Sequence, residues 1–131
     1  MVCLLKDAGE NLKEKKDWDP IRRARPRFRD MSHSERKLII DTDPSFGRLI
    51  CRCENVTEGE ILAEIHAPIP ATTYDAIKRR TWLGTGRCQG GFDMPRVVNI
   101  IADELNVSPL QVTKKGQRSN FLDRPTKQVE N

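Results

Sequence analysis

Aromatic side chains and long apolar runs are both scarce in this chain of 131 residues. Phe, Trp and Tyr make up 5% of the residues and hydrophobic residues 37%, so a large dry core is not expected. No segment approaches the roughly 18 consecutive apolar residues of a membrane-spanning helix, and the N-terminus lacks the apolar run and cleavage site of a signal peptide. The composition predicts one compact domain with polar arms, soluble and cytoplasmic.

Enzyme signatures are missing as well. Serine, histidine and acidic residues form no pattern that pairs a nucleophile with a base, and no G-x-G-x-x-G motif follows a predicted strand. We therefore expect no catalytic residue in this chain and no catalytic activity from it alone.

Basic residues outnumber acidic ones by 23 to 19, which gives a net charge of +4 and a pI near 9.0. The most concentrated basic run contains Arg22, Arg23, Arg25, Arg27 and Arg29. Such a run could bind phosphates, but Pro20 and Pro26 interrupt it and it has no aromatic platform beyond Phe28. A solvated strap between domains is favoured, and no nucleic-acid partner is expected.

The chain has four cysteines and no secretion signal, which argues against disulfides. Cys51 and Cys53 form a C-x-C pair that is poorly placed to bond to itself, and Cys88 follows among glycines. Asp93 lies five positions beyond Cys88. Zinc accepts thiolates and carboxylates, and iron–sulfur clusters take thiolates but tolerate another ligand at single positions, so these residues predict a zinc or iron–sulfur site. Cys3, far away in a polar arm, is expected to be a free thiol.

Asp93 has two credible roles. It directly precedes Met94 and Pro95, where its side chain could cap a helix that begins there. It could also be the fourth metal ligand, since the helix dipole would favour its ionised carboxylate. His33 and His66 are expected to be surface or helix-end residues and not ligands.

Glycines surround the third cysteine. The residues expected to contact the cofactor are Gly86, Arg87, Gly90 and Gly91. Glycines let the main chain approach closely and turn its N–H groups toward the sulfurs. The plain alternative is a linker that joins two helices.

Two capping boxes predict helices in the first half of the chain. Ser32 and Glu35 have the spacing of such a box for a short helix through residues 37–40. Thr57 and Glu60 have the same spacing, and the apolar residues after them fall on one face until a proline pair ends the helix.

Two further helices complete an all-α fold class. Thr72 or Thr73 can cap one that runs through Ile77 to about Trp82 and ends in glycines. An apolar stripe at three- and four-residue spacing predicts another over 94–105. We expect a small helical metal-binding domain with an extended N-terminal arm and a polar C-terminal tail. Fewer than about 70 residues carry its core, a size at which metal binding and folding are usually coupled.

A turn signal over 43–47 separates the polar arm from the helical region. The expected organisation is a connector over 1–46, the metal-binding domain over 47–106 and a tail over 107–131.

Three segments carry a family resemblance. They are Cys-Arg-Cys-Glu-Asn-Val-Thr-Glu-Gly-Glu-Ile from residue 51, Ile-Lys-Arg-Arg-Thr from residue 77, and Gly-Thr-Gly-Arg-Cys-Gln-Gly-Gly-Phe from residue 84. Together they resemble the [2Fe-2S] domain named after bacterioferritin-associated ferredoxin, in the version found at the C-terminus of FAD-dependent glycerol-3-phosphate dehydrogenases. The resemblance implies ligands at Cys51, Cys53, Cys88 and position 93, which is Asp in this chain.

By the same resemblance, the connector is expected to follow a flavin-containing catalytic domain that holds the FAD. A [2Fe-2S] cluster would relay electrons from the flavin to an acceptor protein or quinone system, or would sense redox state. The residues alone also fit a structural zinc module that joins domains or subunits, and a homo-oligomer is an open alternative.

Overall fold

The computed structural model describes residues 26–125, together with positions 7–9, 11, 13 and 16. Cys3 and three arginines of the basic run, Arg22, Arg23 and Arg25, lie outside the described residues.

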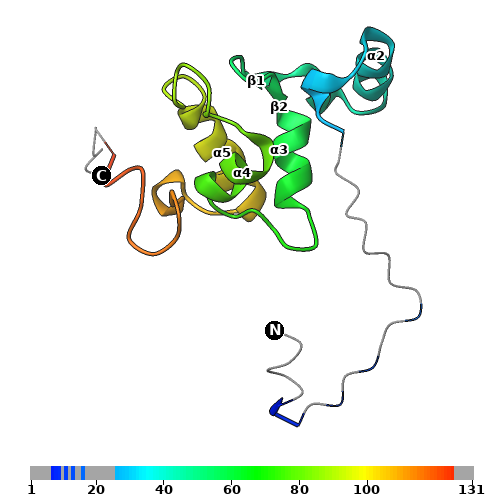
Figure 1. The fold of residues 1–131 in the computed structure, drawn as a ribbon. Helices are drawn as coiled ribbons and strands as arrows, with labels where there is room; N and C mark the ends of the chain where they lie inside the picture. The colour runs from blue at the N-terminus through cyan, green and yellow to red at the C-terminus, as the bar shows by residue number, and fades with distance from the viewer. Residues whose placement is uncertain (1–6, 10, 12, 14–15, 17–25, 126–131) are drawn as a thin grey trace.

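Helices dominate the described part of the chain and confirm the expected fold class (Figure 1). They are α2 (His33–Thr42), α3 (Glu58–Ile65), α4 (Tyr74–Thr81) and α5 (Met94–Leu105). Short 3₁₀ helices accompany them: η1 (Phe28–Asp30), η2 (Pro44–Gly47) and η3 (Pro109–Gln111). None of the described helices is long and apolar enough to cross a membrane.

The helix starts agree with the predicted caps. Ser32 accepts from the Glu35 N–H while the Glu35 carboxylate accepts from the Ser32 N–H, which is the predicted capping box of α2. Thr57 and Glu60 form the same reciprocal pair at α3. At α4 the cap is Thr73, whose hydroxyl accepts from the main chain one turn on.

The helix ends differ more from expectation. α2 is longer than the predicted 37–40 segment and reaches Thr42. α4 ends at Thr81, close to the predicted end at about Trp82, but its C-cap is Trp82 itself, left-handed with φ of 68°, and not the glycines expected to end it. α5 has the predicted bounds and ends at left-handed Asn106.

A short hairpin, which the sequence analysis missed, carries the C-x-C pair. β1 (Leu49–Cys51) pairs antiparallel with β2 (Val56–Thr57), and the register shifts between Leu49 and Cys51. Within the turn, Asn55 has a positive φ of 52°, a conformation that Asn tolerates better than most residues. The hairpin places Cys51 in the core and leaves Cys53 exposed.

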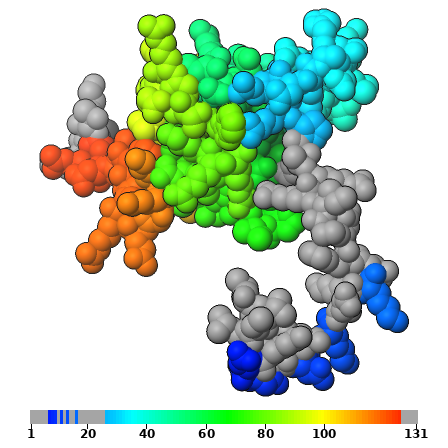
Figure 2. Space-filling model, viewed as in Figure 1, coloured from blue at the N-terminus to red at the C-terminus, as the bar shows by residue number. Residues whose placement is uncertain are grey.

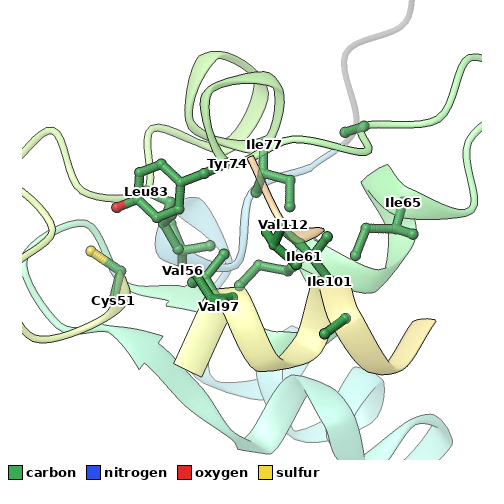
Figure 3. Packing of buried hydrophobic residues seen from close by; sticks show 13 residues of the cluster. Cys51, Val56, Ile61, Ile65, Tyr74, Ile77, Leu83, Val97, Ile101 and Val112 are labelled. Carbon is green, nitrogen blue, oxygen red and sulfur yellow. The ribbon is translucent and has the colours of Figure 1, made fainter. Parts of the chain in front are cut away.

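The core is formed by the hairpin, α3, α4, α5 and the segment after η3 (Figure 3). Its largest fully buried apolar side chains are Ile61, Ile77, Leu83, Ile101, Val56 and Val97. Val112 is also buried, so part of the predicted C-terminal tail packs on the core. The domain boundaries proposed from the sequence stay predictions.

The segment before the hairpin lies against one side of the helical core (Figure 2). The Phe28 N–H donates to Oε1 of Glu60 at 3.0 Å, while Oε2 of the same carboxylate accepts from the Thr57 N–H. On α2, Arg36 donates to the carbonyl oxygens of Phe28 and Arg29 at 3.0 and 2.8 Å. Residues 28–29 are therefore tied to both α2 and α3.

A close contact packs η2 onto α3. A Cβ atom added to Gly59 would lie 2.4 Å from Cδ2 of the Phe46 ring, too close for an alanine to fit without moving the ring. Glycine in a helix normally weakens it, so at this position packing outweighs helix propensity.

We predict that Gly59→Ala destabilises the fold, although alanine is the better helix former. The helix would gain up to about 1 kcal/mol, whereas overpacking against the partly buried Phe46 ring should cost about 1–3 kcal/mol. Urea or thermal unfolding should show the loss. In a Phe46→Leu background the same substitution should cost less or stabilise, and a single variant as stable as the parent would contradict the described packing.

Candidate metal centre

The four predicted ligands come from the hairpin and from the loop between α4 and α5, which meet where α5 begins. Cys51 ends β1, Cys53 lies in the hairpin turn, Cys88 lies in the loop between α4 and α5, and Asp93 directly precedes α5. The sulfur atoms of Cys53 and Cys88 are 3.6 Å apart. The Asp93 carboxylate acts on the pKa of both the Cys51 and the Cys88 thiols, so it lies near both sulfurs.

Cys51 is the buried sulfur, with 1% of the residue exposed. Burial raises the pKa of its thiol, and the Asp93 carboxylate adds to the rise. Backbone hydrogen bonds from Gly84 and Glu54 act in the opposite direction. A bound metal cation would favour the thiolate at this site, because ligating thiols are deprotonated.

The pKa of the Cys88 thiol is lowered, whereas that of Cys51 is raised. A backbone hydrogen bond from Gly90 lowers the pKa of the Cys88 thiol, and the Cys53 thiol and the backbone of Phe92 act in the same direction. The loop thus turns main-chain donors toward the sulfur, which is what its glycine content favours. Such hydrogen bonds stabilise negative charge on a cysteine sulfur.

Two of the predicted cofactor-contacting glycines permit close approach. A Cβ atom on Gly86 would lie 2.4 Å from Cβ of Cys53. One on Gly90, whose φ is 88°, would lie 2.5 Å from the hydroxyl of Tyr74. A side chain at either position would displace a residue of the centre.

The other predicted contacts are arranged differently. The Gly91 N–H donates to the carbonyl oxygen of Cys88 at 2.9 Å and so closes the loop on itself. Arg87 is exposed beside the third cysteine. Arg80, on α4, forms an ion pair of 3.3 Å with Glu64 of α3.

Asp93 does not act as the helix cap that the sequence also allowed. Its φ and ψ of −92° and −27° are helical, and its side chain makes no capping hydrogen bond. Only 2% of the residue is exposed. Oδ1 accepts from the Tyr74 hydroxyl at 3.2 Å, while Oδ2 is buried without a hydrogen-bond partner among the described residues. A buried, unpartnered carboxylate oxygen is rare because it is costly, and here it points to a ligand.

Sequence reasoning missed Tyr74. Its burial, followed by the nearby charge of Asp93, raises the pKa of its hydroxyl, so it remains a hydrogen-bond donor at neutral pH. It is the single tyrosine of the chain and lies 19 residues from Asp93, and no local motif joins the two. The weak available signal is a polar aromatic at a helix start, which must find a partner when buried.

His66 and the described arginines of the basic run, Arg27 and Arg29, contact residues outside the four candidate ligands. His66 ends α3 and pairs with Glu104 of α5 at 2.5 Å, and His33 is exposed at the start of α2. In the strap, Arg27 lies 4.2 Å above the centre of the Trp82 ring. Arg29 pairs with the carboxylate of Glu54, next to the C-x-C pair.

The sulfur spacing suits ligation of a metal by both thiolates. Two thiolates on one tetrahedral metal, each about 2.3 Å from it, lie about 3.8 Å apart, close to the 3.6 Å between Cys53 and Cys88. Among the described residues, no three His, Cys, Asp or Glu side chains are grouped so that they could hold a single ion.

Comparison with known proteins gives the same class. Residues 49–103 match the family described as the BFD-like [2Fe-2S] binding domain. The resemblance seen in the sequence is therefore confirmed over this segment, which is less than half of the chain.

One relative extends the comparison to nearly the whole chain. It is a glycerol 3-phosphate dehydrogenase from Caloramator mitchellensis, 43% identical over 127 residues. The matched region is 97% of this chain but 26% of the relative, so the chain spans about a quarter of that protein's length. No solved structure matches the chain.

The spacing of the sulfurs predicts a specific product in metal-free protein. Mild oxidation with diamide should join Cys53 to Cys88, whose sulfurs are 3.6 Å apart, and leave buried Cys51 free. Peptide mapping by mass spectrometry identifies the pair. Gly86→Ala should slow the reaction because its Cβ displaces Cys53. Bridges that consistently include Cys51 would contradict the pairing.

Proposed function

We propose that this chain is the iron–sulfur domain of a flavin-dependent dehydrogenase and that its [2Fe-2S] cluster transfers electrons or senses redox state. The proposed ligands are Cys51, Cys53, Cys88 and Asp93. The observation that carries the proposal is that these donors meet at the start of α5, with the sulfurs of Cys53 and Cys88 3.6 Å apart and one oxygen of the buried Asp93 carboxylate without a partner among the described residues. The family match over 49–103 supports iron as the metal.

In this arrangement, Cys51, Cys53, Cys88 and Asp93 would hold the cluster, which would supply reversible one-electron exchange. The chain's own contribution is to exclude water around Cys51 and Asp93, which are 1% and 2% exposed, and to leave the Cys53 side open to solvent. Backbone hydrogen bonds to the sulfurs make reduction easier, because they stabilise the added negative charge.

The partner proposed is a flavin-containing catalytic domain in the same polypeptide. The support is the relative named glycerol 3-phosphate dehydrogenase, of which this chain matches 26%. On this proposal FAD and glycerol 3-phosphate bind to that other domain, and the acceptor is a further protein or a quinone system. The cytoplasmic location and a homo-oligomeric state stay predictions.

The metal itself provides the test. Anaerobic reconstitution with ferrous iron and sulfide should give about two irons and two sulfides per chain and a brown protein with visible charge-transfer bands. Cys51→Ser, Cys53→Ser and Cys88→Ser should each lose iron, while Cys3→Ser should match the parent. About one tightly bound zinc with no iron uptake would instead establish the structural zinc module. Uptake of neither metal would exclude a metal site.

An Asp93 series tests the fourth ligand. Asp93→Ala removes the donor, and Asp93→Asn replaces a carboxylate with a neutral amide, which is a much poorer ligand, so both should lose iron. Asp93→Cys should hold the cluster more firmly, because thiolate is the softer ligand. Iron content and melting temperature should be measured across the series, and full iron retention in Asp93→Asn would remove Asp93 from the ligand set.

A further inference from the structure

We infer that Tyr74 is a positioning residue for the Asp93 ligand: its hydroxyl holds Oδ1, so that only Oδ2 is presented to the metal. The inference rests on the proposed [2Fe-2S] site and deepens it. It assigns a binding role to a residue outside the cysteine motifs and specifies which carboxylate oxygen ligates.

The two oxygens of Asp93 have different surroundings. Oδ1 accepts from the Tyr74 hydroxyl at 3.2 Å, in a contact between residues that are 5% and 2% exposed. Oδ2 is equally shielded from solvent, yet it has no hydrogen-bond partner among the described residues. One oxygen is therefore already occupied by the protein, and the other is free to bind a metal as a single-atom donor.

Several contacts hold Tyr74, and with it the hydroxyl group, in place. Tyr74 is the first residue of α4, and its main-chain N–H donates to the carbonyl oxygen of Thr113 at 3.3 Å. Its ring makes an edge contact with Phe121, with centroids 5.3 Å apart and planes at 73°. On the other side, a Cβ on Gly84 or Gly90 would lie 2.6 or 2.5 Å from the hydroxyl oxygen. The ring and loop fix where the hydroxyl donates.

A carboxylate ligand needs an orienting hydrogen bond, whereas a thiolate ligand does not. Asp has two equivalent oxygens and can rotate about its terminal bond, so it can bind through either oxygen or through both. A hydrogen bond to one oxygen removes that choice and orients the ligand, as outer-shell partners generally do at metal sites. The Tyr74 hydroxyl should therefore matter with Asp at position 93 and lose its role with Cys there.

A double-mutant cycle in the reconstituted chain tests this. The variants are Tyr74→Phe, Asp93→Cys and the two combined, with ferrous iron and sulfide as the probe. Tyr74→Phe keeps the ring and its contact with Phe121. It should weaken iron binding about 10- to 100-fold, the usual effect of removing an outer-shell partner. The measurements are the rate at which a chelator removes iron and the position of the visible absorption bands.

In the Asp93→Cys background, Tyr74→Phe should leave both readouts unchanged. Ile65→Val is the packing control, because Ile65 is buried in the core and makes no contact in this argument: it should lower the melting temperature without changing iron retention. Equal iron retention in Tyr74→Phe and the parent would overturn the inference, as would equal losses in both backgrounds, which would mean that Tyr74 acts through packing. Failure of the parent to take up iron would instead refute the proposed site, and this inference with it.

Discussion

Burial of the Asp93 carboxyl group is the constraint on which this small domain depends. A carboxylate taken out of water costs several kcal/mol unless each oxygen finds a partner. The protein supplies one partner, the Tyr74 hydroxyl, and leaves the second oxygen without one among the described residues. Since a domain of this size has little stability to spare, a ligand that completes the set would also complete the fold.

The neighbouring segments are shaped around that carboxyl group. The hairpin register shifts next to Cys51, which lets one cysteine of the C-x-C pair enter the core and the other remain at the surface. The loop before α5 uses glycine where a side chain would strike Cys53 or Tyr74. The result is a centre with one buried side and one open side, whose candidate ligands come from two segments, the hairpin and the loop before α5.

Much of this could be predicted from the sequence, because much of it is local. The capping boxes at Ser32 and Thr57 and the apolar stripe of α5 depend on spacings of three and four residues, and the structure has them where the sequence placed them. The hairpin could not be predicted in the same way, since its strands are three and two residues long and too short to show an alternating pattern.

The predicted ligands were recognisable from their types and order, but their pairing was not. Neighbours in the C-x-C motif separate, and Cys53 instead lies near Cys88, 35 residues away. The choice between cap and ligand at Asp93 was also beyond the sequence, because both roles suit the residue before a helix. In the folded chain the Asp93 side chain makes no capping hydrogen bond and instead accepts from Tyr74, 19 residues away, while its role as a ligand stays a prediction.

The shared carboxylate of Glu60 has a mechanical consequence. One of its oxygens accepts from the Phe28 N–H and the other from the Thr57 N–H, so a single side chain joins the segment that begins η1 to the end of the hairpin. Thr57 lies four residues after Cys53. Tension applied to the chain ahead of Phe28 would therefore reach the end of the hairpin through two hydrogen bonds and the Glu60 side chain of α3. A movement of the chain upstream of Phe28 would in this way displace the hairpin turn that carries Cys53 of the metal centre.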